Sequence, residues 1–184
     1  MKLGVFGPQG SGKTLFVMVL IRSLQKKYGG VKIYTNINAT GQDIEVINDL
    51  GEIPFQDGKP KIFVIDEAYF TLDSRGSSSK QNRIWSRAFA LFRKSDIVLT
   101  VFVTHRPRML DVNIREQLDM VLMCRKEKDM FSYLLLDTLS MMTTPIQMPK
   151  HPYIYNFADY DTKDFPLAIW TEKLQENPIF QLIK

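Results

Sequence analysis

The sequence predicts an α/β fold with a mostly parallel central sheet flanked by helices. Short apolar runs typical of buried strands alternate with segments in which apolar residues recur at helical spacing. A glycine-rich turn separates the first strand from the first helix, and the 184 residues are 45% hydrophobic and 24% charged, as in a globular protein. Such alternation favours parallel strands covered on both faces. We expect one domain over residues 1–184, with a core of about 1–140 and an irregular tail over 141–184.

The first half of the chain predicts three strands and two helices. Each strand is a short, largely apolar run, and the longer helix ends where Gly29 and Gly30 interrupt its pattern. A loop follows at 51–60, which holds two glycines and two prolines. The expected elements are a strand at Lys2–Phe6, a helix at Lys13–Tyr28, a strand at 31–37, a short helix at 43–50 and a strand at 61–66.

The second half continues this alternation and then loses its periodicity. Residues 71–82 include a small, polar stretch that we expect to be mobile, and the Ile97–Thr104 run is the clearest buried strand. Beyond Met141 the spacing of four prolines predicts an irregular tail packed over the domain. The expected elements are a helix at 83–94, strands at Ile97–Thr104 and 120–124, a short helix at 112–118, and a strand at Met130–Asp137 paired with 120–124.

Composition excludes several classes of protein. Lys and Arg number 24 against 20 Asp and Glu, a net charge of +4 that is compatible with nucleic acid but not diagnostic of it. The lone Cys124 excludes an internal disulfide, and two histidines and one cysteine make no zinc set. No run reaches the roughly 18 apolar residues of a membrane span, and the N-terminus does not resemble a signal peptide. We expect a soluble, intracellular protein.

The strongest motif lies between the first strand and the first helix. Its glycines let the backbone wrap phosphate oxygens, and its N–H groups and the helix N-terminus favour an anion. Lys13 is expected to reach the β- and γ-phosphates of ATP, and Thr14 to offer its hydroxyl to Mg²⁺. The sequence fits G-x-x-x-x-G-K-[ST] at every fixed position, with the residues Gly7, Pro8, Gln9, Gly10, Ser11, Gly12, Lys13 and Thr14.

A pair of carboxylates follows the strand at 61–66. In an open parallel sheet, ligands gather at the carboxyl ends of the strands. Asp66 is therefore expected to hold Mg²⁺ through a water, and Glu67 to activate the attacking water as general base. Surface turns often contain Asp-Glu, so the pair alone is weak evidence for a site. It becomes strong evidence only because the same chain contains the phosphate loop.

A third candidate element ends the Ile97–Thr104 strand. If that strand lies between the other two, Thr104 or His105 is placed to contact the γ-phosphate. His105 is equally consistent with a neutral loop histidine. We expect the other histidine, His151, to be exposed.

These elements together resemble the FtsK–HerA superfamily of ring-forming ATPases. The resemblance covers about residues 1–124 and rests on the phosphate loop, on Asp66-Glu67-Ala68, and on the stretch from Arg93 to Arg115 with its Thr-His-Arg-Pro. Two branches are most similar: the genome-packaging ATPases of membrane-containing icosahedral viruses, and the zonula occludens toxin-like assembly proteins of filamentous phages. The family commonly has glutamine where His105 stands, and a histidine's charge varies near neutral pH.

The resemblance implies a P-loop NTPase fold of the RecA and FtsK–HerA type, with ATP and Mg²⁺ as cofactors. It also implies a homo-oligomeric ring, commonly a hexamer, in which an arginine from a neighbouring subunit completes each site. The candidates are Arg83, Arg87, Arg93 and Arg115, of which Arg87 and Arg93 are favoured because their helix enters the strand before His105.

The same resemblance implies partners and a location. Double-stranded DNA would pass through the ring, where the basic stretch 74–83 would touch its phosphates, although a surface loop explains that stretch equally well. A viral capsid, or a membrane-associated virion protein, would be the further partner. The implied location is the host cytoplasm, with attachment to a virion or a membrane only through partners.

Three functions therefore remain open. The first is an Mg-dependent ATPase that translocates DNA into a viral capsid, preferred because no membrane span is visible. The second is an ATPase that extrudes filamentous phage. The third, from another class, is a small-molecule kinase, for which Arg75 to Arg87 would form a lid; a non-catalytic nucleotide switch is a weaker fourth. Asp66 and Glu67 fit water activation better than a phosphoacceptor site.

Overall fold

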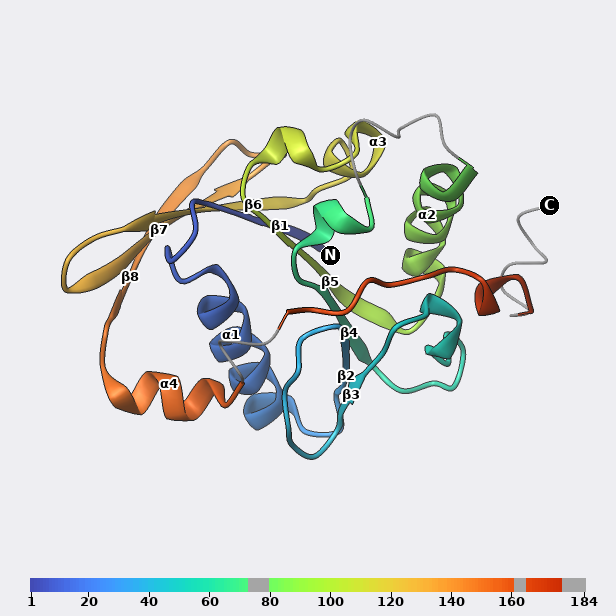
Figure 1. Ribbon diagram of the computed structural model, residues 1–184, viewed down its shortest axis with the longest axis horizontal. Coiled ribbons are helices and arrows are strands. Elements are labelled where there is room, and N and C mark those ends of the chain that lie inside the picture. The colour runs from blue at the N-terminus through green and yellow to red at the C-terminus, as the bar shows by residue number, and fades with distance from the viewer. Residues whose placement is uncertain (73–79, 161–164, 177–184) are drawn as a thin grey trace.

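The computed structural model describes residues 1–72, 80–160 and 165–176. Within these ranges an eight-stranded sheet of order β3-β2-β4-β5-β1-β6-β7-β8 forms the centre of the molecule (Figure 1). The strands from β3 to β6 in this order are parallel to their neighbours, and β7 and β8 are antiparallel. The bounds are β1 Lys2–Phe6, β2 Lys32–Thr35, β3 Ile44–Val46, β4 Lys61–Ile65, β5 Ile97–Thr104, β6 Met120–Lys126, β7 Met130–Asp137 and β8 Thr143–Pro149.

Helices cover both faces of this sheet. Helices α1 (Lys13–Tyr28) and α4 (Pro152–Ala158) pack together on one face, and α2 (Lys80–Leu91) and α3 (Val112–Arg115) lie on the other (Figure 1). Because side chains alternate along a strand, Ile62 and Val64 of β4 pack under α1, while Phe63 and Ile65 pack on the α2 side. The predicted α/β fold with a mostly parallel, helix-flanked sheet is confirmed.

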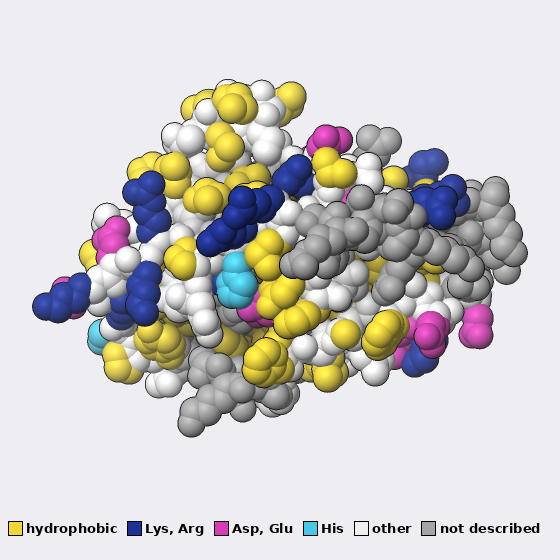
Figure 2. Space-filling model, turned by 45° about the horizontal axis from the view of Figure 1, so that its top comes forward, with side chains coloured by type: hydrophobic (Ala, Val, Ile, Leu, Met, Phe, Trp, Pro, Cys, Tyr) yellow, Lys and Arg dark blue, Asp and Glu magenta, His cyan; other side chains and the backbone are white. Residues whose placement is uncertain are grey.

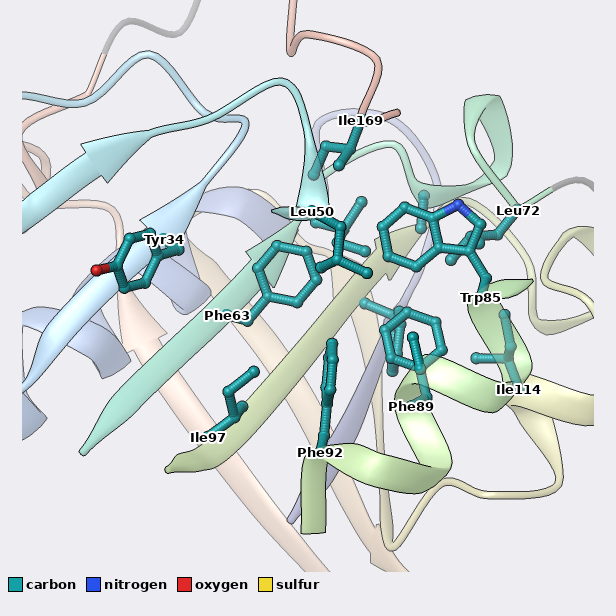
Figure 3. Close-up of a cluster of buried hydrophobic side chains, with 14 of the residues drawn as sticks. Tyr34, Leu50, Phe63, Leu72, Trp85, Phe89, Phe92, Ile97, Ile114 and Ile169 are labelled. Atoms are coloured by element: carbon teal, nitrogen blue, oxygen red, sulfur yellow. The ribbon is translucent and has the colours of Figure 1, made fainter. Parts of the chain in front are cut away.

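An aromatic cluster fills the core beneath α2. Trp85 stacks on Phe89, and Phe89 meets Phe92 and Phe102 edge-on, with ring centroids 4.8–5.1 Å apart. Figure 3 shows Phe63, from β4, and Leu50, from the 3₁₀ turn at Leu50–Glu52, beside this cluster. Such pairs add to the stabilisation from burial alone. They fix α2 against β5, the strand that leads into the candidate site.

The predicted helix at 43–50 is wrong. Ile44–Val46 forms β3, which pairs with β2 at the edge of the sheet, and a 3₁₀ turn follows at Leu50–Glu52. Two β-branched residues alternating around Glu45 satisfy a strand better than a helix. The run is too short for periodicity to distinguish the two.

The prediction of an irregular tail from residue 141 is wrong for residues 143–158. Strand β8 tolerates Pro145 and Pro149 because it lies at the edge of the sheet. Helix α4 begins at Pro152, where a missing N–H costs nothing, and the exposed His151 caps it by accepting a hydrogen bond from the Tyr153 N–H. Two smaller shifts are that α2 begins at Lys80 rather than residue 83, and that β6 continues to Lys126.

Residues 165–176 return across the molecule to the β2 side of the sheet (Figure 1). The Leu167 N–H donates to the Asn36 carbonyl, and the Trp170 N–H donates to the Asn48 carbonyl. The described segment is therefore held to the residues that follow β2 and to those that follow β3. Within the described ranges, no helix is long and apolar enough to cross a membrane.

Candidate functional site

Three strand ends converge at one edge of the sheet. Strand β5 lies between β1, which leads into the phosphate loop, and β4, which leads into Asp66 and Glu67. The strand that leads into His105 therefore lies between the other two, as its predicted contact with the γ-phosphate requires. A cavity of about 600 Å³ opens at this edge and is lined by Lys13, Thr14, Asp66, Glu67 and His105, among others. On the face shown in Figure 2, Lys and Arg side chains gather around a hollow that contains histidine and acidic side chains.

The backbone of the loop is shaped by glycines that no other residue replaces without strain. Gly12 has a φ of 79°, and a Cβ built on it would lie 2.7 Å from the Phe131 ring. A Cβ on Gly7 would lie 2.5 Å from the Cys124 carbonyl oxygen. Helix α1 then starts at Lys13 with no acidic residue in its first turn. The N–H groups of this terminus are thus available to a phosphate.

Lys13 is 7% exposed, and its ammonium points into the loop. Its Nζ donates to the Pro8 carbonyl at 3.1 Å and lies 3.4 Å from His105 Nδ1. Among the described residues it has no ion pair within 4.0 Å. A buried cation without a contacting carboxylate favours an anionic ligand such as a phosphate.

Thr14 and Asp66 meet directly. The Thr14 hydroxyl donates to Asp66 Oδ2 at 2.7 Å, and the Glu67 N–H donates to Asp66 Oδ1 at 2.8 Å. Burial raises the pKa of Asp66 above its usual value, although these hydrogen bonds oppose the shift. A hydroxyl and a carboxylate beside a phosphate cradle are oxygen donors that fit Mg²⁺, which prefers few protein ligands. The donor set at this position therefore suits the implied metal.

Glu67 follows Asp66 with a left-handed backbone, with a φ of 48°. Its Oε1 lies 3.7 Å from His105 Nε2, whereas its buried Oε2 has no hydrogen-bond partner in the described part of the chain. Burial, and then the charge of Asp66, raise the pKa of Glu67. A half-buried carboxylate with a raised pKa and an unpaired oxygen is suited to accept a proton from water.

A pH dependence follows from this environment. Only ionised Glu67 can accept a proton, so kcat/KM is expected to fall as the pH is lowered through its raised pKa. The acid limb should therefore lie above the usual range for a glutamate. A pH profile of ATP turnover measures it, and the residual rate of Glu67→Gln should lack this limb. An identical limb in that variant would contradict the assignment.

His105 is brought into the cavity and linked to both neighbours. Because the Lys13 ammonium can only donate, His105 Nδ1 accepts and Nε2 carries the proton toward Glu67. The Tyr69 ring packs 5.7 Å from the imidazole. The contact that His105 would make with a γ-phosphate stays a prediction. Thr104 is buried and does not line the cavity, and its hydroxyl has no hydrogen-bond partner among the residues that the structure describes.

The candidate arginines lie elsewhere. Arg83 and Arg87 are exposed on α2, Arg115 is partly exposed at the end of α3, and Arg93 stands in the 3₁₀ turn that follows α2. The side chain of Arg93 lies outside the described part. None of the arginines that the structure describes lines the cavity. Of the basic stretch 74–83, residues 74–79 also lie outside the described residues.

Several cavity residues were missed from the sequence. Tyr155, Tyr160, Phe165 and Pro166 line the cavity from the region expected to be an irregular tail. Asn36, at the end of β2, bonds to the backbone of Asp66. Its signal was present, because a polar residue there ends a buried strand at the same edge as Asp66.

Comparisons with known proteins agree with this geometry. The profile of the family described as ATPase family associated with various cellular activities (AAA) matches residues 3–126. The structure is similar to the N-terminal domain of zonular occludens toxin from Neisseria meningitidis, with a TM-score of 0.60 and 20% identity over 87% of this chain and 98% of that chain.

Two viral proteins are also similar in structure. The genome packaging NTPase B204 of Sulfolobus turreted icosahedral virus 2, in complex with ATP-γS, matches with a TM-score of 0.57 and 14% identity over 78% of this chain and 95% of that chain. The DNA-packaging ATPase B204 of Sulfolobus turreted icosahedral virus matches with a TM-score of 0.58 and 16% identity over 82% and 98%. At these identities the likeness concerns the fold, and at that level the predicted resemblance is confirmed.

Proposed function

The chain belongs to the ATPase family associated with various cellular activities, and on this premise we propose that it is a motor that hydrolyses ATP to move double-stranded DNA into a viral capsid. The observation that carries the hydrolytic part is the convergence of Lys13, the Thr14–Asp66 pair and Glu67 on one cavity. The DNA part is supported by the similarity in fold to proteins that package genomes. The mild positive charge of +4 is compatible with a polyanionic partner.

In this proposal the phosphate loop binds the triphosphate. The N–H groups of Gly10, Gly12, Lys13 and Thr14 surround the β-phosphate, and Lys13 leaves the Pro8 carbonyl and His105 to pair with the β- and γ-phosphates. Thr14 and Asp66 would hold Mg²⁺, which would neutralise charge on the phosphates. Glu67 then orients a water in line with the γ-phosphate and takes its proton. His105 lies between Lys13 and Glu67, so the loss of the γ-phosphate would change its surroundings directly.

The site is proposed to be completed by a second copy of the chain. Among the described residues no arginine lines the cavity, although transition-state charge in this class is commonly stabilised by one. In a homo-oligomeric ring, with a hexamer as the expected size, Arg87 or Arg93 of one subunit would face the site of the next. The exposure of Arg87 is compatible with such a role.

The decisive experiment is ATP turnover by the purified protein with and without linear double-stranded DNA, at low and high salt. We expect DNA to stimulate turnover and the stimulation to fade with salt, because phosphate contacts release counterions. In the triple variant Arg75→Ala, Lys80→Ala, Arg83→Ala, DNA binding should weaken and the slope of log affinity against log salt should fall by about 0.9 for each phosphate that is no longer neutralised. Lys26 and Lys27 at the far end of α1, changed to alanine, are the matched control.

An ATP turnover rate that is the same with and without DNA would contradict the packaging proposal. It would favour a second candidate, an assembly ATPase that extrudes filamentous phage. One observation favours that candidate: the zonular occludens toxin domain matches 87% of this chain, against 78% and 82% for the two packaging proteins. Unchanged DNA binding in the triple variant would remove the basic stretch 74–83 from the proposal.

A further inference from the structure

Asn36 is a buried polar residue whose side-chain oxygen and nitrogen are both hydrogen-bonded. It follows β2, is 2% exposed, and its carboxamide makes three hydrogen bonds. The Oδ1 accepts from the Asp66 N–H at 2.8 Å, and Nδ2 donates to the Asp66 carbonyl at 2.9 Å and to the Leu167 carbonyl at 2.8 Å. Both polar groups of the Asp66 backbone are thus bound by one side chain.

The same residue holds a segment from the far end of the chain. We call residues 165–171 the C-terminal strap. The Leu167 N–H donates to the Asn36 carbonyl at 3.2 Å, so Leu167 is bound to Asn36 through both of its main-chain groups. Farther along, the Ile169 N–H donates to the Thr71 hydroxyl at 3.3 Å, and Thr71 follows the turn that begins at Glu67. The strap is therefore bonded to Asn36, which holds the Asp66 backbone, and to Thr71, which follows the Asp66–Glu67 turn.

The strap also reaches the nucleotide cavity. Phe165 and Pro166 line the cavity, as do Ile37 and Asn38, which follow Asn36 in the chain. Asn36 consequently links three things: the backbone of the carboxylate that meets Thr14, the turn that carries Glu67, and the wall formed by the strap. A carboxylate that must present one oxygen to a metal needs its backbone fixed as well as its side chain.

We propose that Asn36 is the positioning residue for Asp66, and that it couples the metal-binding carboxylate to the C-terminal strap. The inference rests on the proposed function of the same site, because it assigns Asp66 to Mg²⁺. Asn36 touches neither nucleotide nor metal in this proposal. It acts by holding the Asp66 peptide so that Oδ2 faces Thr14.

The proposal predicts a defect specific to the metal. In Asn36→Ala the Mg²⁺ concentration for half-maximal nucleotide affinity and turnover should rise by about 10–100-fold, the usual cost of losing a residue that orients a metal ligand. Affinity for ADP measured in EDTA should stay at the wild-type value. Asn48→Ala is the matched control, because Asn48 is bonded to the strap only through its backbone carbonyl, which accepts from the Trp170 N–H, and its side chain is exposed.

A merely structural role gives a different pattern. It would lower the melting temperature and the fraction of active protein, while the folded fraction kept the wild-type Mg²⁺ requirement. An unchanged Mg²⁺ requirement in folded Asn36→Ala would overturn the proposal. If that variant does not fold, Leu167→Pro decides, because it removes the N–H bonded to Asn36 from an exposed position of the strap. It should raise the Mg²⁺ requirement in the same direction, and no change would refute the coupling.

The readout separates this inference from the proposed function. Binding of ADP and ATP-γS with and without Mg²⁺ requires neither DNA nor hydrolysis. A wild-type protein that binds Mg-nucleotide but is not stimulated by DNA would end the packaging proposal and leave the role of Asn36 measurable. Normal DNA-stimulated turnover, with a wild-type Mg²⁺ requirement in Asn36→Ala, would end the inference alone.

Discussion

Glu67→Gln is expected to lower kcat by about 10²–10⁴-fold, the usual contribution of a general base, while the affinity for Mg-ATP is retained. The amide keeps the size of the side chain but cannot accept the proton of the attacking water. The phosphate loop, Lys13 and the Thr14–Asp66 pair are untouched by the change. Single-turnover hydrolysis and equilibrium binding of a fluorescent ATP analogue measure the two effects separately.

The control for this change is Glu116→Gln, at an exposed glutamate after α3. It makes the same change of charge away from the cavity and should leave kcat unaltered. Normal turnover in Glu67→Gln would remove Glu67 as the base. A parallel loss of binding would instead show that the unpaired Oε2 contributes to nucleotide affinity.

The parts of the site that the sequence predicts are those in which chain order dictates geometry. The motif from Gly7 to Thr14 is continuous in the sequence. The strand before it and the helix after it determine where the loop lies. Asp66 and His105 could be added because the carboxyl ends of parallel strands meet at one edge. Local residue types and one rule of topology were therefore enough for this part of the cavity.

What the sequence did not predict depends on contacts between distant segments. Asn36 meets Asp66 across 30 positions and Leu167 across 131, and no local pattern specifies either pairing. Strand β8 was hidden because prolines argue against a strand unless its place at the sheet edge is known. Short elements such as β3 are decided by their neighbours rather than by their own periodicity. The aromatic residues Tyr155, Tyr160 and Phe165 of the cavity were missed because they reach it from a distant part of the chain.

The two carboxylates of the site bear on stability as well as on chemistry. Burial raises the pKa of both Asp66 and Glu67, so ionising them in the folded protein is less favourable than in the unfolded chain. The free energy of unfolding should therefore increase as the pH falls through the raised pKa values and the two groups become protonated. At neutral pH, where both groups act in their ionised form, this contribution to stability is absent. Such a cost is expected of residues kept for function.

Lys13→Ala is expected to abolish measurable turnover, with a loss of at least about 10²–10³-fold for removing a preorganised charge from the transition state. Binding of ATP should weaken as well, because the ammonium is expected to contact the β- and γ-phosphates in the ground state too. Lys13→Arg should not restore activity. The lysine fits between the Pro8 carbonyl and His105 at 7% exposure, and a planar guanidinium needs more room.

The thermal stability of Lys13→Ala makes this prediction sharper. Within the described residues Lys13 has no ion pair, so its buried charge stabilises the empty protein little. The melting temperature without nucleotide should therefore be no lower than that of the wild type, while the stabilisation by added Mg-ATP should be lost. Lys26→Ala, in the exposed last turn of the same helix, is the control for both measurements. A variant that unfolds would mean that Lys13 supports the loop itself, and one that turns over normally would mean that the phosphates bind elsewhere.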